Sequence, residues 1–208
     1  MMTDNPTLKK VYTARNSEEL MNAYKDWAAN YENDTVASCG YVAHIASARA
    51  LDRVLERSDA VILDAGCGTG LVGEALRDMG YERIDALDYS PEMLKQAERK
   101  RVYRRHIQAD LSRPLEFGDN VYDAVVCTGT FTYGHVKADA FAELIRITRP
   151  GGYICFTIRE GAYEDYGYRQ RMLELEQNNA WELLSMQDED YFRQEKVSCK
   201  LCTYVVKN

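Results

Sequence analysis

The sequence predicts an α/β fold: a mostly parallel seven-stranded sheet with an antiparallel last strand and helices on both faces. From about residue 60, short apolar runs alternate with amphipathic helical patterns, which is typical of parallel strands joined by helices. Five strands of this kind are followed by two further apolar runs, close enough to pair as an antiparallel hairpin. Together these seven strands make the predicted sheet.

The composition excludes several classes of protein. The chain has 208 residues, the size of one domain, and a net charge of −7, so nucleic acid is a poor partner. No apolar run approaches the ~18 residues of a membrane span, and residues 1–12 lack the apolar centre of a secretory signal. Six cysteines without an export signal indicate reduced thiols. We therefore expect a cytoplasmic globular protein without a membrane partner, as a monomer or homodimer.

Two helices are predicted ahead of the alternating region. Asn16 is the expected N-cap of the first, and Glu19 completes a capping box. Apolar and aromatic residues then recur at helical spacing on one face: Leu20, Tyr24, Trp27 and Tyr31. Asn33 and Asp34 are expected to interrupt this pattern. The inner face of the second helix is expected to carry Val42, Ile45, Ala46, Ala50 and Val54.

Capping and turn residues divide the alternating region. The predicted strands are 61–63, 83–88, 102–109, 121–127 and 153–158, with the hairpin at 181–186 and 197–206. The predicted helices are 71–79, 92–99, 138–147 and 163–178. Gly80 suits the end of the first of these helices, and Ser90 with Pro91 suits the start of the next. A turn at Arg149–Gly152 precedes the fifth strand.

A glycine-rich turn, Asp64–Gly70, follows the first strand and begins a helix. Its glycines allow the backbone to approach a ligand, and the helix N-terminus supplies unpaired N–H groups. Two registers are open. The run Gly68–Gly73 matches G-x-G-x-x-G, and Asp88 ends the next strand, as in a nicotinamide site. That run begins two residues too late after the strand, whereas the register that starts at Gly66 is in the right place.

The turn Asp64–Gly70 resembles motif I of the class I S-adenosylmethionine (SAM)-dependent methyltransferases. The resemblance continues in the family's order through Leu87–Ser90, Gln108–Leu111 and Arg149–Gly152. Tyr24–Tyr31 and Tyr133–His135 are similar to the small Williams–Beuren-region methyltransferase-like group. The resemblance implies a Rossmann-like fold, with SAM as cofactor and S-adenosylhomocysteine as product.

SAM contains a sulfonium cation, an amino-acid part and an adenosine, so acidic residues around the turn favour its binding. By resemblance, Asp64 faces the amino group of the methionine part, directly or through water, and Asp88 accepts from both ribose hydroxyls. Asp110 accepts from the adenine amino group, the Leu111 N–H meets a ring nitrogen, and Tyr89 and Leu111 flank the ring. The glycines close to the methionine part are Gly66, Gly68 and Gly70. Alone, each aspartate is more often a helix cap; together they follow successive strands at one sheet edge, where open α/β folds bind ligands.

The resemblance also implies one domain over 1–208, with a helical lid segment at 1–37 and a core at 38–208. Three aromatic residues of the lid are expected near the sulfonium, or packed on the sheet edge: Tyr24, Trp27 and Tyr31. Cys127 begins the loop after the fourth strand and is counted with the cofactor-binding residues.

The methyl acceptor is expected at the ends of the fourth and fifth strands, because transfer requires a nucleophile aligned about 3 Å from the methyl group. His135 is the candidate general base, or alternatively a cap of the fourth helix. Tyr133 orients the substrate or packs. The loop after the fifth strand is interpreted as solvated, with a substrate pocket as the alternative: Arg159, Glu160, Tyr163, Tyr166 and Tyr168.

No metal is expected, because Cys199 and Cys202 form a lone C-x-x-C pair. The basic residues between 99 and 105 are interpreted as a solvated helix end, with a small patch for an acidic substrate or RNA as the alternative. We predict an enzyme that moves a methyl group from SAM to an O, N or S nucleophile of a small molecule. The alternatives are a non-catalytic SAM-binding regulatory subunit of another enzyme and a nicotinamide-dependent oxidoreductase.

Overall fold

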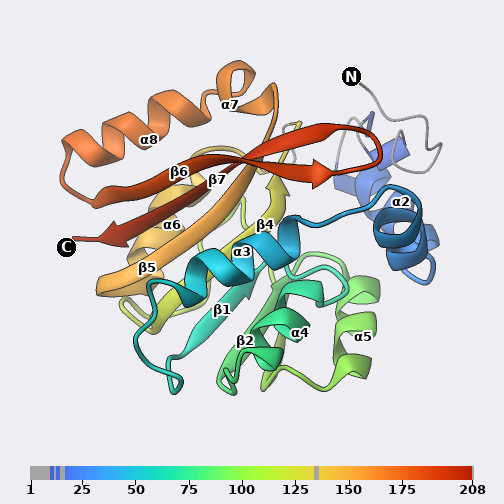
Figure 1. Cartoon of the computed structure of the whole chain (residues 1–208), viewed down its shortest axis with the longest axis horizontal. Coiled ribbons are helices and arrows are strands. Elements are labelled where there is room, and N and C mark those ends of the chain that lie inside the picture. Colours follow the sequence, from blue (N-terminus) through green and yellow to red (C-terminus); the bar gives the residue numbers. More distant parts are fainter. Residues whose placement is uncertain (1–9, 12, 15–16, 134–135, 208) are drawn as a thin grey trace.

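The centre of the fold is a seven-stranded sheet with the strand order β3-β2-β1-β4-β5-β7-β6 (Figure 1). The computed structural model describes residues 10–11, 13–14, 17–133 and 136–207. The strands are β1 (Ile62–Ala65), β2 (Ile84–Asp88), β3 (Arg105–Gln108), β4 (Tyr122–Phe131), β5 (Thr148–Arg159), β6 (Trp181–Phe192) and β7 (Val197–Val206). The first five are parallel, and β7 runs antiparallel to both of its neighbours. The predicted mixed sheet is therefore confirmed.

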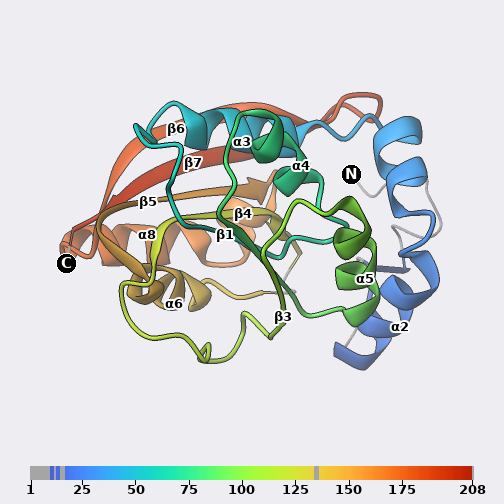
Figure 2. The same ribbon diagram turned by 90° about the horizontal axis from the view of Figure 1, so that it is seen from below.

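Helices cover both faces of the sheet (Figures 1 and 2). They are α2 (Ser17–Trp27), the π-helix η1 (Asn33–Ser38), α3 (Ala43–Asp52), α4 (Leu71–Asp78), α5 (Pro91–Lys100), α6 (Ala140–Ile147), α7 (Ala162–Asp165) and α8 (Tyr168–Gln177). On one face α3 and α4 pack against Ile62 and Val126, and α5 packs against Ala86. On the other face Phe141 of α6 and Met172 of α8 belong to the larger core cluster.

The N-terminal segment differs from the sequence prediction. The helix α2 ends at Trp27, and the expected interruption at Asn33 and Asp34 is instead the start of η1. Trp27 Nε1 donates to Asp34 Oδ2 at 2.8 Å, which joins the two helical pieces. In α3, Ile45 is 38% exposed rather than buried. Asn16, the expected N-cap, lies outside the described residues.

Two turn regions also differ from the prediction. The helix expected at 163–178 is two helices, because Gly167 between α7 and α8 has a φ of +74°. The turn expected at Arg149–Gly152 is a bulge within β5: Tyr122 pairs with Thr148, whereas Ala124 pairs with Tyr153. Both differences arise at glycines. Glycine permits backbone conformations that the spacing of apolar residues in the sequence does not predict.

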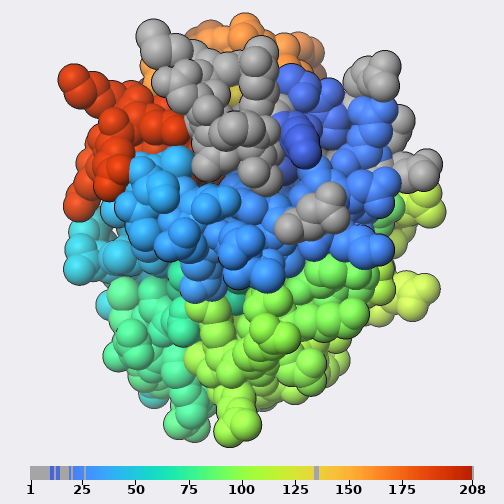
Figure 3. All heavy atoms as spheres, turned by 90° about the vertical axis from the view of Figure 1, so that its right-hand side faces the viewer, coloured from blue at the N-terminus to red at the C-terminus, as the bar shows by residue number. Residues whose placement is uncertain are grey.

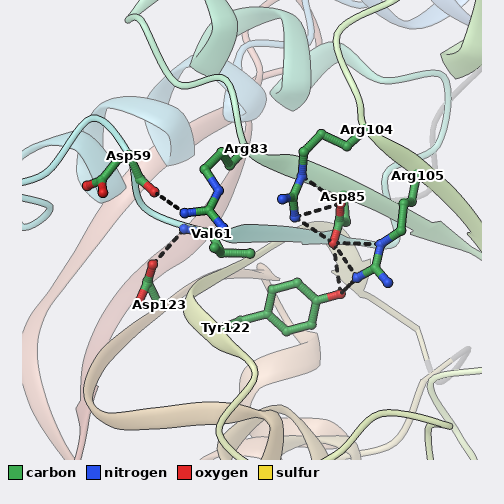
Figure 4. A network of polar contacts seen from close by, with 8 residues as sticks. All are labelled: Asp59, Val61, Arg83, Asp85, Arg104, Arg105, Tyr122 and Asp123. Atoms are coloured by element: carbon green, nitrogen blue, oxygen red, sulfur yellow. Dashed lines mark hydrogen bonds and ion pairs between the residues drawn. The ribbon is translucent and has the colours of Figure 1, made fainter.

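The basic residues between 99 and 105 are exposed apart from Lys100, whose side chain is 13% exposed, so the interpretation as a solvated helix end is wrong for Lys100; Arg104 and Arg105 are both exposed and paired. Asp85, fully buried on β2, accepts from Arg105 at 2.6 Å and from Arg104 at 3.1 Å (Figure 4). The hydroxyl of Tyr122 lies 3.2 Å from the same carboxylate. Lys100 is ion-paired with carboxylates of two other segments. The arginines attach β3 to β2 at the edge of the sheet.

We expect Asp85→Ala to lower the free energy of unfolding by about 2 kcal/mol, because a buried hydroxyl and two arginines lose their acceptor. The urea unfolding midpoint measures this loss. Asp59→Ala is the matched control: this side chain is 65% exposed in its pair with Arg57, and the midpoint should not change. Equal effects of the two substitutions would contradict a structural role for Asp85.

Candidate cofactor-binding site

A pocket of about 140 Å³ lies at the carboxyl ends of β1, β2 and β4, beneath α2. Figure 3 shows this side of the molecule, where the N-terminal segment in blue lies next to the green region of α4 and α5. Eight of the predicted cofactor-binding residues line the pocket: Tyr24, Tyr31, Gly66, Gly68, Asp88, Tyr89, Asp110 and Leu111. These residues come from four segments that are far apart in the sequence, and the fold brings them together.

The glycine-rich turn is shaped by hydrogen bonds to β2. Gly66 N–H donates to the carbonyl of Leu87 at 2.7 Å. Gly66 has a φ of +75°, and a Cβ atom there would overlap with Oγ1 of Thr130. Gly68 has a φ of +54°, and its N–H donates to Asp88. The turn therefore presents bare backbone to the pocket and leaves no room for a side chain at Gly66.

Asp88 lies at the end of β2 and is fixed by backbone donors on both sides. Its Oδ1 accepts from the N–H of Ser90 and its Oδ2 from the N–H of Gly68, each at 2.8 Å. Burial raises the pKa of Asp88, and the backbone N–H groups oppose this shift. Each carboxylate oxygen can accept a second hydrogen bond, so the pair is suited to a vicinal diol.

Asp110 and its neighbours form the outer end of the pocket. Asp110 Oδ1 accepts from the N–H of Ser112 at 2.8 Å, and Arg113 lies 3.5 Å from its other oxygen. Leu111 is buried, and Tyr89 is 39% exposed. An acidic acceptor beside one buried apolar and one aromatic side chain fits a planar heterocycle with an exocyclic amine.

Asp64 lies on β1 behind the glycine-rich turn and does not line the pocket. It is fully buried; its Oδ2 accepts from Tyr103 at 2.6 Å, and its Oδ1 has no hydrogen-bond partner within the described part of the chain. Burial, together with the nearby charge of Asp88, raises the pKa of Asp64 to about 7. A buried carboxylate oxygen without a donor fits an ammonium group, so the residues present fit SAM.

Four other predicted site residues lie away from the pocket lining. Gly70 is next to the ring of Tyr103 instead. Trp27 is buried between Tyr24 and Tyr31, with ring centroids 6.4 and 4.7 Å away, so it supports the two residues that do line the pocket. Cys127 is buried in the core, where burial raises the pKa of its thiol to about 12. Tyr133, the last of the four, packs against Tyr166 and Arg159.

His135, the candidate general base, lies outside the described residues. The guanidinium carbon of Arg159 lies 4.9 Å from the ring centroid of Tyr133, and Tyr166 packs edge-on against Tyr133. Arg159 is only 1% exposed and Tyr168 is fully buried. The interpretation of this loop as solvated is therefore wrong for these two residues and right for Tyr166.

Nine further lining residues are not among the predicted cofactor-binding residues, although Ser90, Ala109 and Thr128–Thr130 lie in segments singled out from the sequence: Met21, Ser90, Met93, Ala109, Ser112, Thr128, Gly129, Thr130 and Val136. Thr128–Thr130 reach the pocket because the register of β4 against β5 shifts between Cys127 and Phe131. Gly129 has a φ of +78° within this irregularity. The spacing of apolar residues in the sequence cannot predict this register shift, although a glycine within a predicted strand, here Gly129, is typical of one.

Cys199 and Cys202 are buried in different core clusters. Among the residues whose placement is described, no group of three or more His, Cys, Asp or Glu side chains could hold a metal ion. In the same part of the chain, no helix is long and apolar enough to cross a membrane.

Comparisons with known proteins identify the family. Residues 63–156 match the family described as Methyltransferase domain. Methyltransferase-like protein 27 of Homo sapiens is 34% identical over 171 residues, which cover 79% of this chain and 69% of that protein. The chain belongs to the class I SAM-dependent methyltransferases. The predicted enzyme class and cofactor are therefore confirmed, as is the similarity to the Williams–Beuren-region group.

Two further relatives are similar to this methyltransferase. Malonyl-[acyl-carrier protein] O-methyltransferase of Buchnera aphidicola is 30% identical over 157 residues, which cover 75% of this chain and 61% of that protein. The methyltransferase thus spans less than two thirds of that relative. A TehB-like SAM-dependent methyltransferase from Corynebacterium glutamicum superposes with a TM-score of 0.66 at 23% identity, covering 89% of this chain and 99% of that one. This superposition shows a shared fold.

We expect Gly66→Ala to destabilise the methyltransferase by about 3 kcal/mol, the sum of left-handed backbone strain and overlap with Thr130. Gly80→Ala is the control, because its φ of +95° imposes the strain but nothing lies within 4 Å; it should cost about 1 kcal/mol. In the double variant Gly66→Ala/Thr130→Ala, urea unfolding should show that the free energy of unfolding recovers the part lost through the overlap, which is the difference between Gly66→Ala and Gly80→Ala. No recovery would show that the overlap is not the cause.

Proposed function

We propose that this methyltransferase transfers the methyl group of SAM to an O, N or S nucleophile of a small molecule. The observation that carries this proposal is the construction of the pocket. Its lining residues come from the turns of the core and from the short helix α2 with Tyr31. Within the described residues, no inserted domain extends this end of the sheet to recognise a macromolecule.

In the proposed complex, Asp88 accepts from the ribose hydroxyls and Asp110 from the adenine amino group. Tyr89 and Leu111 lie on either side of the adenine, and Asp64 faces the methionine ammonium. The lining positions of Asp88, Tyr89, Asp110 and Leu111 support this arrangement. The segment 1–37 acts as the cover, which is supported by the contribution of Tyr24 and Tyr31 to the lining.

SAM supplies a methyl group activated by its sulfonium. The chain's task is to hold the acceptor in line with that group and to exclude water. Thr128–Thr130, at the end of β4, border the pocket on the acceptor side. His135 is the proposed general base, and Tyr133 is proposed to orient the acceptor.

A second candidate is an acceptor carried on a protein. The similarity to malonyl-[acyl-carrier protein] O-methyltransferase supports it. A discriminating assay supplies free carboxylic acids, phenols, amines and thiols in one set of reactions and carrier-bound acyl groups in another. Formation of S-adenosylhomocysteine only with carrier-bound acyl groups would replace the small-molecule proposal.

We expect Asp88→Ala to weaken S-adenosylhomocysteine binding by about tenfold or more, because charge-assisted bonds to the ribose are lost. Calorimetric titration measures the affinity, with NAD titrated in parallel. The control Asp188→Ala removes a carboxylate paired with Lys200 on the surface and should leave binding unchanged. Unaltered affinity in Asp88→Ala would remove Asp88 from the proposed site.

We expect His135→Ala to reduce turnover by about 100-fold, the lower range of general acid–base catalysis, while SAM affinity stays as in the wild type. Release of S-adenosylhomocysteine with an active acceptor measures turnover. Full activity of the variant would remove the general base from the mechanism, and parallel loss of SAM binding would place His135 in the cofactor site instead.

A further inference from the structure

Tyr103 connects three elements around the glycine-rich turn. It lies in the loop between α5 and β3, and its hydroxyl donates to Oδ2 of Asp64 on β1 at 2.6 Å. The same hydroxyl accepts from the N–H of Gly73, in the first turn of α4, at 3.2 Å. The phenol oxygen therefore has a donor and an acceptor role at once, which fixes the direction of its proton toward Asp64.

Two glycines make room for this ring. A Cβ atom at Gly73 would overlap with the Tyr103 hydroxyl, and one at Gly70 would lie 3.0 Å from Cε2 of the ring. The ring also packs between the α3–α4 cluster and the α5 cluster. Tyr103 thus explains the need for glycine at Gly73, whereas at Gly70 the ring adds to the φ of +94° and to the nearby backbone of Ala97.

We propose that Tyr103 is a positioning residue for cofactor binding: it holds Asp64 through one carboxylate oxygen and leaves the other available to the ammonium group of SAM, directly or through a water molecule. The inference rests on the role proposed above for Asp64. It is supported by the difference between the two oxygens, because Oδ2 accepts from Tyr103 whereas Oδ1 has no partner within the described part of the chain.

The charge around Asp64 gives the tyrosine a second effect. The groups facing this carboxylate are Asp88 on β2, the thiols of Cys67 and Cys127, and Tyr103. Burial and Asp88 raise the pKa of Asp64 to about 7, whereas the Tyr103 hydrogen bond and, to a smaller extent, the backbone N–H of Gly73 lower it. Tyr103 therefore increases the ionised fraction of Asp64 near neutral pH.

The sign of the pH dependence follows from this raised pKa. Only the ionised carboxylate attracts an ammonium group, so affinity should rise as the pH increases through about 7. Without the Tyr103 hydroxyl, the pKa of Asp64 rises further. The increase in affinity then occurs at higher pH, and binding at neutral pH is weaker.

The test is calorimetric titration of wild type and Tyr103→Phe with two ligands, from about pH 6 to about pH 9. S-adenosylhomocysteine carries the amino-acid part, and 5′-methylthioadenosine lacks it. We expect Tyr103→Phe to weaken S-adenosylhomocysteine binding about tenfold at neutral pH and to shift its pH profile upward by about one unit. Methylthioadenosine binding should be the same in both proteins and independent of pH.

Tyr81→Phe is the matched control. Tyr81 is also buried, on the same face of the sheet, and its hydroxyl donates to Asp52 at 2.9 Å, away from the glycine-rich turn. Its removal should leave both affinities and the pH profile unchanged. Asp64→Asn is the second variant: it should bind S-adenosylhomocysteine weakly at every pH.

The outcomes are distinguishable. An unchanged profile in Tyr103→Phe, or equal weakening for both ligands, overturns the positioning role while the proposed cofactor site stands. If neither ligand binds the wild type, the site itself is wrong, and the inference fails with it. A pH dependence that persists in Asp64→Asn shows that another group titrates and also overturns the inference.

Discussion

The pairing of β1 with β2 on one side and β4 on the other is the constraint on which the site depends. Parallel pairing brings the carboxyl ends of all three strands to one edge of the sheet. The glycine-rich turn is attached to this edge by N–H groups that donate to the last residues of β2. A shift of one residue between β1 and β2 would move the turn away from Asp88 and dismantle the pocket.

The acidic character of this edge has an energetic cost that the fold only partly compensates. Asp88 has two backbone donors and Asp64 has a phenol, yet burial still raises the pKa of both carboxyl groups. A cationic ligand removes that cost by supplying positive charge where the chain supplies only neutral dipoles. The site therefore favours a cation such as SAM over a phosphate-bearing dinucleotide, despite the glycine pattern that both share.

Much of the fold could be predicted because the local sequence signals, such as helix caps and apolar strands, agree with the tertiary structure. Ser90 caps α5 as expected, with its hydroxyl accepting from Met93, and the strand order places the three aspartates on one edge. The sequence could not show the irregular β4, because the register shift beside Gly129 depends on pairing with β5. Nor could it show that Tyr103 crosses to Asp64, since that contact joins residues 39 positions apart.

The ion pairs of Lys100 determine how much free energy is needed to separate the proposed cover, segment 1–37, from the rest of the protein. This lysine is 13% exposed and pairs with Glu32, in the N-terminal segment, and with Glu74 of α4. Because two anions share one cation, withdrawal of Glu32 leaves the ammonium still neutralised by Glu74. Glu32 itself is partly exposed and can be rehydrated. In the proposed role of segment 1–37 as a cover, its release leaves no buried charge uncompensated, so this contact adds only the cost of one surface ion pair, up to about 1 kcal/mol, to ligand entry and exit.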